Sequence, residues 1–353
     1  MKILHTADIH LTKRGDERWK ALETLLEIGR DKKIEILVIS GDLFDKDIDA
    51  EDLRPYLRDL FSNNDFKIVL IPGNHDGESY SPGTYFGANA TILLDLNTPF
   101  EHGDLNIWGM PFEPAGGEVI LEKLHGLANK LSPSRKNILL YHGELLDAFF
   151  ARTDFGEEGE ERYMPVKLSY FKDLKIDYVL AGHFHSRFDA HRLESGGYFV
   201  YPGSPVSITR RETGKRSVNI FEVGEPPEEW YLDTPHFEEI VVELDPFRSD
   251  NPVDIIQGHV ESLHPNARAI LTVRGFINGA KIELSEMDLV QRIEQIAERR
   301  RVDKVYEFKD ISFILEDDLF KTFSDKVDQT HHEDEKKTQM KHMAIRAMIK
   351  ARL

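Results

Sequence analysis

The sequence has 353 residues, a length expected for two domains or for one large domain with a cap. Hydrophobic residues make up 40% of it, enough for a sizeable core, and the absence of cysteine excludes disulfides and thiolate zinc sites. The 45 Lys and Arg against 63 Asp and Glu give a net charge of −18, which argues against coating nucleic acid through phosphate neutralisation. The negative charge is nevertheless compatible with a nuclease, because bound metal ions supply positive charge at the scissile phosphate.

The absence of cysteine and of long apolar segments suggests where the protein resides. Only two adjacent apolar residues precede Asp8, too few for the core of a signal peptide. No apolar run approaches the ~20 residues of a membrane span. We therefore expect a cytoplasmic protein that does not enter a membrane.

The first half of the chain predicts alternating strands and helices. Amphipathic patterns at residues 19–31 and 50–61 predict helices. Short apolar runs rich in β-formers predict buried strands at 3–4, 36–39, 68–71, 138–141 and 178–180. From residue 190 the pattern changes to strands and turns, with strands expected at 198–201, 217–223 and 229–232. The sequence thus predicts an α/β body of two packed sheets flanked by helices.

A boundary is expected near residues 233–235, followed by a smaller α+β domain. Strands are predicted at 237–244, 268–274 and 306–314, and helices at 253–263 and 285–299. We therefore divide the chain into domains at 1–235 and 236–316 and a helical tail at 317–353. The second domain contains no metal-binding motif, so it is interpreted as a cap that shapes the substrate site or as a structural appendage.

The tail carries an apolar stripe at helical spacing. It consists of Met340, Met343, Ala344, Ala347, Met348 and Ala351. Methionine is common on surfaces that bind partner helices, so the stripe is a candidate docking site. The alternatives are that the helix folds back on its own domain, or that a second copy of the chain completes the stripe as a homodimer.

Five short segments carry the chemistry, and each follows one of the predicted buried strands. They are Asp8-Ile9-His10, Gly41-Asp42-Leu43-Phe44-Asp45, Gly73-Asn74-His75-Asp76, His142-Gly143 and Gly182-His183-Phe184-His185. Sheets of this kind place their sites just beyond the carboxyl ends of the strands. The five segments are therefore expected to converge at one edge of the fold.

The residue types in these segments fit two divalent metal ions. Asp8 and His10 can reach one ion from a single loop, and Asp42 can bridge two ions that are ~3.5–4 Å apart. Asn74 and His142 add an amide oxygen and an imidazole, and His183 and His185 point the same way in an extended segment. Mixed nitrogen and oxygen ligands favour Mn, Fe or Zn over Mg, and Mn²⁺ is our leading expectation.

His75 is the candidate general acid. It lies beside the ligand Asn74, where it can face a leaving group rather than a metal ion. Asp45, three residues after Asp42, is the expected partner for the other ring nitrogen and would favour the protonated ring. Asp76 is the alternative partner, or it holds a turn.

Other segments have weaker functional signals. Tyr80, Tyr85 and Phe86 could stack on unpaired bases, or they could be packing residues. The charges at 210–211 and 215–216 are interpreted as a solvated cluster in a hairpin turn. The glutamate-rich segment 155–162 predicts an acidic loop near His142.

The order of the five motifs resembles the calcineurin-like metallophosphoesterase superfamily over about residues 1–225. The resemblance implies a four-layer α/β/β/α sandwich around two metal ions. By position it assigns one ion to Asp8, His10, Asp42 and His185, the other to Asp42, Asn74, His142 and His183, and the catalytic role to His75.

A narrower resemblance is to the SbcD-type DNA repair exonucleases. It rests on the opening segment 3–11, on residues 41–45, on Tyr201-Pro202-Gly203-Ser204-Pro205 with the following charged turn, and on the added domain. It implies a Mn-dependent DNA exonuclease and endonuclease that acts in double-strand-break repair with an SbcC-type SMC-like ATPase. Asp45 departs from the histidine usual in archaeal and eukaryotic members, which leaves the balance of the two activities open.

Two rival functions remain. A metallophosphatase or a cyclic-nucleotide phosphodiesterase would use the same metal motifs. A non-catalytic scaffold with a degenerate site is disfavoured, because the ligand set is complete.

Overall fold

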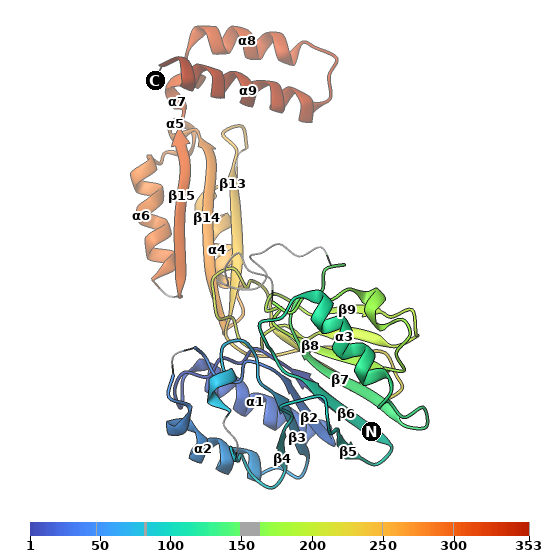
Figure 1. Ribbon diagram of the computed structural model, residues 1–353. Coiled ribbons are helices and arrows are strands. Elements are labelled where there is room, and N and C mark those ends of the chain that lie inside the picture. The colour runs from blue at the N-terminus through green and yellow to red at the C-terminus, as the bar shows by residue number, and fades with distance from the viewer. Residues whose placement is uncertain (47, 81–82, 149–162, 249, 299, 353) are drawn as a thin grey trace. The chain divides into compact units, whose positions relative to one another are not determined.

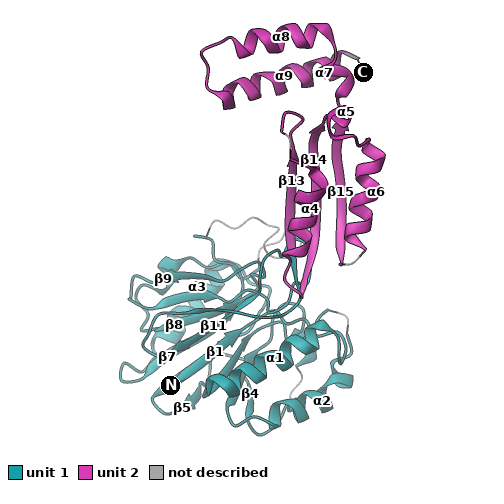
Figure 2. Ribbon diagram, turned by 180° about the vertical axis from the view of Figure 1, so that it is seen from behind, with its two compact units in different colours: residues 1–237 teal, residues 238–353 magenta. Residues whose placement is uncertain are grey.

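The computed structural model describes residues 1–353 except 47, 81–82, 149–162, 249, 299 and 353, so the acidic loop predicted at 155–162 lies outside the described residues. The chain divides into two compact units, Met1–Phe237 and Glu238–Leu353, which Figure 2 colours separately. Each unit has its own hydrophobic clusters. No helix in the described part of the chain is long and apolar enough to cross a membrane.

The first sheet of unit 1 has the strand order β12-β11-β1-β2-β3-β4. These strands are β12 (Glu229–Tyr231), β11 (Ser217–Glu222), β1 (Lys2–Thr6), β2 (Ile36–Ser40), β3 (Lys67–Ile71) and β4 (Ala90–Ile92). Strands β1 to β4 are parallel, with Ile3 opposite Ile36, whereas β11 is antiparallel to both of its neighbours. The carboxyl ends of β1, β2 and β3 therefore meet at one edge.

The second sheet has the order β5-β6-β7-β8-β10-β9. Its strands are β5 (Phe100–His102), β6 (Leu105–Met110), β7 (Lys136–His142), β8 (Tyr178–Gly182), β10 (Tyr198–Tyr201) and β9 (Asp189–Arg192). The four central strands are parallel and the two edge strands are antiparallel to their neighbours.

Helices cover the outer faces of both sheets (Figure 1). Helices α1 (Glu17–Lys32) and α2 (Ala50–Ser62) share a buried cluster with the first sheet, and α3 (Gly117–Ala128) shares one with the second. A third cluster, which includes Ile3, Val38, Ile138 and Leu140, joins the two sheets. The predicted α/β sandwich is confirmed. Two single turns of 3-10 helix, η1 (Gly77–Ser79) and η3 (Leu168–Phe171), lie in loops.

The start of α1 shows how local sequence sets an element. The Asp16 carboxylate accepts a hydrogen bond from the Trp19 N–H at 2.8 Å and caps the helix. Lys33 then ends the helix in a left-handed conformation, and its N–H reaches the carbonyls of Arg30 and Gly29. The helix predicted at 19–31 is thus confirmed, with one short extension at each end.

Unit 2 is built on the sheet β13-β14-β15. The strands are β13 (His236–Leu244), β14 (Ala267–Ile277) and β15 (Val302–Asp310), and the accompanying helices are α4 (Pro252–Glu261), α5 (Gly279–Ile282) and α6 (Glu286–Ala297). Its core includes Ile256, Leu271, Leu289 and Ile293.

The last predicted strand, at 306–314, is wrong in its bounds. Strand β15 starts at Val302, and helix α7 (Ser312–Leu315) begins shortly after it ends. The Asp310 carboxylate accepts from both the N–H and the hydroxyl of Ser312, at 2.9 and 2.6 Å, and this turns the chain out of the sheet.

The C-terminal helices α8 (Asp318–Asp328) and α9 (Asp334–Arg352) pack together. Ile345, which the predicted stripe omits, is fully buried in a cluster with Ile311, Ile314 and Phe320. Met343 of the stripe is instead 72% exposed. Helix α9 thus folds back on its own unit through Ile345, and part of the stripe remains on the surface.

Candidate metal centre

The seven predicted metal ligands lie at or just beyond the carboxyl ends of parallel strands. Asp8 and His10 follow β1, Asp42 follows β2 and Asn74 follows β3. In the second sheet His142 ends β7, and His183 and His185 follow β8. The two sheets face each other across the cluster of Ile3 and Ile138, so both sets of loops open at the same edge.

The backbone at these ligands is unusual. Seven non-glycine residues in the described ranges have positive φ, and four of them are predicted ligands: Asp8 (55°), His10 (51°), Asp42 (51°) and His183 (91°). Such conformations cost about 1–3 kcal/mol each and persist only where the surroundings impose them. Hydrogen bonds between the loops after β1 and β2 do so, from Asp8 N–H to the Gly41 carbonyl at 3.1 Å and from His10 N–H to the Asp42 carbonyl at 3.0 Å.

At two glycines in the motifs there is no room for a side chain. A Cβ on Gly41 would overlap the ring of His142, and one on Gly73 would overlap the Asp42 carboxylate. Gly41 also has a φ of 95°, which favours glycine. Both glycines let side chains from neighbouring strands approach the backbone closely.

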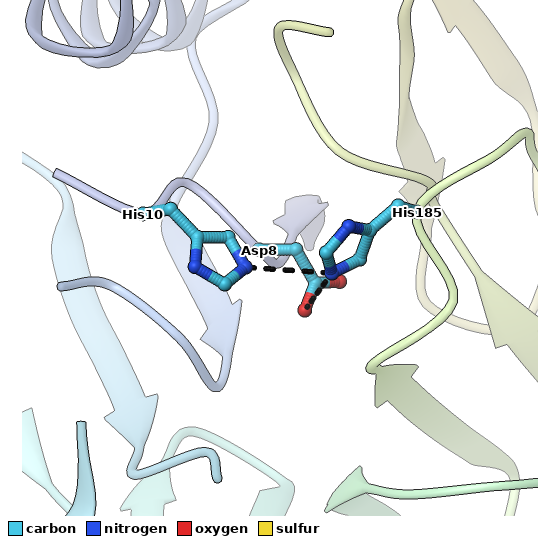
Figure 3. Close-up of side chains that lie close together, drawn as sticks. All are labelled: Asp8, His10 and His185. Atoms are coloured by element: carbon cyan, nitrogen blue, oxygen red, sulfur yellow. Dashed lines mark hydrogen bonds and ion pairs between the residues drawn. The ribbon is translucent and has the colours of Figure 1, made fainter. Parts of the chain in front are cut away.

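Asp8, His10 and His185 form the first ligand group (Figure 3). Their ligand atoms all lie within 4.8 Å of one another, and all three residues are buried. The two Nε2 atoms are 3.4 Å apart, and His185 Nε2 is 3.6 Å from a carboxylate oxygen of Asp8. Burial raises the pKa of Asp8 above its usual value, a cost that a bound cation would offset.

Asp42 and His142 lie at the centre of the second group. His142 Nε2 is 2.8 Å from the Asn74 side-chain oxygen and 3.4 Å from Asp42 Oδ2. His183 Nδ1 is 3.2 Å from the same Asn74 oxygen. The structure therefore brings all seven predicted ligands together.

The position of Asp42 Oδ2 matches a bridging ligand. This atom is buried and receives no hydrogen bond from the described residues, yet it lies 3.6 Å from His10 Nε2 and 3.4 Å from His142 Nε2. It is thus placed between the two groups. Burial opposes the charge of Asp42, but the imidazoles of His142 and His10 outweigh it and hold its pKa well below the usual value.

The His142 ring shows that the site suits cations. Its Nδ1 donates to the Ser40 carbonyl at 2.8 Å, which directs Nε2 toward two oxygen acceptors. Burial lowers the pKa of His142, but the Asp42 carboxylate more than reverses this and raises it to about 10. The Asp42 and Asn74 oxygens near His142 Nε2 thus stabilise a positive charge there, and a divalent ion would supply that charge in place of the proton.

The predicted acid His75 lies beside the first group. Its ring is 4.7 Å from that of His10, and its Nδ1 is 3.7 Å from Asp45 Oδ1. The same oxygen is 3.4 Å from His10 Nδ1, so Asp45 faces two histidines rather than one. Arg18, which sequence analysis did not identify, binds the other Asp45 oxygen and donates to the His10 carbonyl at 2.7 Å.

Asp76, the alternative partner of His75, instead holds a turn. Its oxygens accept from the Gly73 N–H at 2.7 Å, the Phe44 N–H at 3.2 Å and the Tyr80 hydroxyl at 3.0 Å. Burial and the charge of Asp42 raise the pKa of Asp76 to about 7. These bonds fix the loop that carries Asn74.

The aromatic candidates in the loop after β3 separate by burial. Tyr80 and Phe86 are 8% and 1% exposed and belong to the core, whereas Tyr85 is 52% exposed. Of the three, Tyr85 is therefore the one available for stacking on a ligand.

Two further residues, Glu212 and Arg216, surround His185. Glu212 is fully buried with one carboxylate oxygen 3.4 Å from His185 Nδ1, and Arg216 is 1% exposed. The interpretation of residues 215–216 as solvated charges is therefore wrong for Arg216. Its guanidinium donates to the backbone carbonyls of Ser186 and Ser204, at 2.9 and 3.0 Å, and this compensates its burial.

Among known structures, the chain resembles TT1561 of Thermus thermophilus at 16% identity and a TM-score of 0.41, with 62% of this chain and 92% of that one covered. It also resembles GAP50, the anchor in the inner membrane complex of Plasmodium, at 12% identity and a TM-score of 0.38, covering 62% and 80%.

Comparison with protein families gives a match over more than half of the sequence. Residues 1–187 match the model of the calcineurin-like phosphoesterases, and this range includes all seven predicted ligands. The chain therefore belongs to the calcineurin-like phosphoesterase family, whose members are metal-dependent hydrolases.

Proposed function

We propose that this hydrolase is a DNA nuclease of the SbcD type, which cleaves phosphodiester bonds during double-strand-break repair. The observation that carries the hydrolytic part is the convergence of the seven predicted ligands, six of them around Asp42, with His75 beside them. The preference for DNA rests on the sequence resemblance over residues 3–11, 41–45 and 201–205 and on the presence of a second unit with its own core.

Two divalent ions fit the donor set, and Mn²⁺ is the proposed metal. Asp8, His10 and His185 would hold one ion and Asn74, His142 and His183 the other, with Asp42 shared. Imidazole nitrogen and carboxylate oxygen together suit Mn, Fe or Zn better than Mg. When bound, such ions supply an activated water and neutralise charge on the phosphoryl oxygens.

His75 would donate the proton to the leaving oxygen. The Asp45 carboxylate near its Nδ1 favours the protonated ring. Burial opposes ionisation of Asp45, but His10 and Arg18 outweigh it and keep its pKa well below the usual value. Asp45 is thus charged at neutral pH, which suits its role toward His75. It would also orient His10, since the same oxygen is nearer to His10 Nδ1.

An SMC-like ATPase of the SbcC type is the proposed partner. The proposed docking element is the exposed face of α9, which includes Met343 and Ala347. Leu319 of α8, 70% exposed, adds apolar surface to the same pair of helices. The net charge of −18 is consistent with an enzyme that needs metal ions and a partner to bind DNA well.

A substrate comparison tests the proposed activity. With Mn²⁺, the protein should degrade duplex or single-stranded DNA in preference to para-nitrophenyl phosphate and its bis-ester. Ending the chain at Phe237 should reduce DNA cleavage far more than bis-ester hydrolysis, which serves as the control for an intact metal site. Equal losses, or a preference for the monoester, would favour the metallophosphatase or cyclic-nucleotide phosphodiesterase.

The partner proposal needs a separate test. Met343→Glu and Leu319→Glu change exposed side chains and should weaken binding to the candidate ATPase in a pull-down assay. Met287→Glu is the matched control, because Met287 is 82% exposed in the same unit but lies on α6. Undiminished binding by the Met343 and Leu319 variants would refute the proposed docking site.

A further inference from the structure

The segment between β10 and β11 contains two buried charges that the proposed metal and acid roles leave unused. Glu212 is 0% exposed and Arg216 is 1% exposed. Burying a charge is costly unless its hydrogen bonds are satisfied. Both residues therefore need a reason for their position, and both lie against His185.

The Glu212 carboxylate is held by its own turn. One oxygen accepts from the Ile208 N–H at 2.8 Å and the Ser204 hydroxyl at 3.0 Å. The other accepts from the N–H and the hydroxyl of Thr209, at 3.2 and 3.1 Å. These four donors fix the carboxylate in place, so it can act as a rigid acceptor for a further group.

That further group is the ring of His185. Nδ1 of His185 lies 3.4 Å from Glu212 Oε1, while Nε2 points the other way, toward Asp8 and His10. A carboxylate accepts but does not donate when ionised, so Nδ1 must carry the proton. Nε2 then presents its lone pair to the metal centre.

Arg216 fixes the backbone around the same histidine. Its guanidinium donates to the carbonyls of His185, Ser186 and Ser204. The Ser204 N–H also donates to the His185 carbonyl at 3.0 Å. Glu212 thus acts on the ring of His185, and Arg216 acts on its main chain.

The outer nitrogens of His185, His10 and His142 contact different kinds of acceptor. In the first group, His185 faces Glu212 and His10 faces Asp45, so both partners are carboxylates. In the second, His142 donates to the neutral carbonyl of Ser40. A carboxylate partner raises the basicity of a ligand imidazole more than a carbonyl does.

We propose that Glu212 is a positioning residue that sets the tautomer of His185 and thereby the affinity of the ion held by Asp8, His10 and His185. This inference rests on the two-metal part of the proposed function and is independent of the DNA substrate. The ion held by Asn74, His142 and His183 should be little affected by changes at Glu212.

Titration of the metal-free, full-length protein with Mn²⁺, followed by calorimetry and electron paramagnetic resonance, tests the selectivity. Glu212→Ala should lower the affinity for one of the two ions by roughly 10–100-fold and change the affinity for the other by no more than a few fold. Glu212→Gln keeps an oxygen that accepts from Nδ1, but it lacks the charge and places an amide NH2 against the Ile208 N–H, so it should recover only part of that affinity. Lys215→Ala is the matched control, because Lys215 is exposed in the same turn.

An equal loss of affinity for both ions in a folded Glu212→Ala variant would overturn the proposal, and so would two unchanged affinities. A direct measurement that needs no variant is the ¹⁵N spectrum of the His185 ring in the metal-free wild type. Nδ1 should be protonated there, and an unprotonated Nδ1 would also overturn the proposal.

The same measurements separate this inference from the proposed function. A protein that binds two Mn²⁺ ions and shows the expected loss in Glu212→Ala, yet does not cleave DNA, would refute the nuclease and leave the role of Glu212 standing. DNA cleavage together with unchanged ion affinities in Glu212→Ala would support the nuclease and refute the role of Glu212.

Discussion

The metal edge of unit 1 and the core of unit 2 are built in opposite ways. All buried charged side chains among the described residues, such as Asp8, Asp42, Glu212 and Arg216, lie in unit 1. In the described part of unit 2 the core is apolar, and Glu283 is the one non-glycine residue with positive φ. Helix α6 of unit 2 begins with a capping box of Ser285 and Asp288, as its local sequence favours.

The contrast lies in where the protein tolerates features that oppose folding. Buried charge and left-handed backbone at the metal edge destabilise the fold and are retained for chemistry. Unit 2 follows local preferences in its core and caps, which is expected of a part selected for stability and shape. Substitutions in the first region should therefore change metal binding and turnover, and those in the second should change mainly stability.

Among substitutions at the metal edge, Asp42→Asn should have the largest effect on metal binding and turnover. The change removes the charge of the oxygen that lies between His10 and His142, so one or both ions should be lost and turnover should fall to background. Metal analysis of the purified variant measures this directly. Asp59→Asn, at an exposed position on α2, is the control. Two tightly bound ions in Asp42→Asn would disprove the bridging role.

His75→Ala should reduce turnover by roughly 10²–10⁴-fold and leave both ions bound, since it removes a proton donor and not a ligand. Steady-state kinetics and metal analysis on the same sample check both parts. Loss of metal in His75→Ala would make His75 a ligand and refute its assignment.

Asp45→Ala should shift the acid limb of the pH–rate profile. Because Asp45 also faces His10, this variant should also weaken the binding of one of the two ions.

Leu271→Ala should act on stability and not on the metal centre. Leu271 is fully buried in the core of unit 2, and such truncations cost about 2–5 kcal/mol. Urea unfolding should show a less stable transition for unit 2, while Mn²⁺ affinity stays unchanged. A matching loss of Mn²⁺ affinity would show that the two regions are not separable in this way.

Ser285→Ala should have the smallest effect. Removing an N-cap hydroxyl costs about 0.5–2 kcal/mol, and here it also breaks the reciprocal bonds with Asp288. Thermal unfolding measures the loss, and bis-ester hydrolysis should be unaffected. Ser285→Asp, which restores an acceptor, should recover most of the stability; if it does not, the cap is not the cause.

Much of the fold followed from local sequence pattern. The strands after which the five motifs occur, and helices α1 and α2, were predicted because each has a strong apolar period or run. Strand β6 and helix α3 were missed. All six residues of β6 are buried, so it lacks the alternation that marks a half-buried strand, and Asn106 and Gly109 interrupt its apolar run.

The tail shows a second limit of pattern. The stripe from Met340 to Ala351 correctly predicted a helix, but the fully buried residue is Ile345 beside it, and of the stripe Ala344 and Met348 pack against the same cluster. A helical period indicates that an apolar face exists and does not say which partner covers it. Here Ile311, Ile314 and Phe320 cover Ile345 and decided the orientation.

Local sequence pattern was enough to identify the seven candidate metal ligands and to predict that they converge, because each motif follows a strand and parallel strands end at a common edge. What surrounds these residues depends on the packing of segments that are far apart in the sequence. Arg18 reaches Asp45 across 27 residues and Glu212 reaches His185 across 27 residues, contacts that no local pattern encodes. Their charges look like ordinary surface charges in the sequence. It is burial, which depends on the packing of the whole unit, that makes Glu212 and Arg216 part of the site.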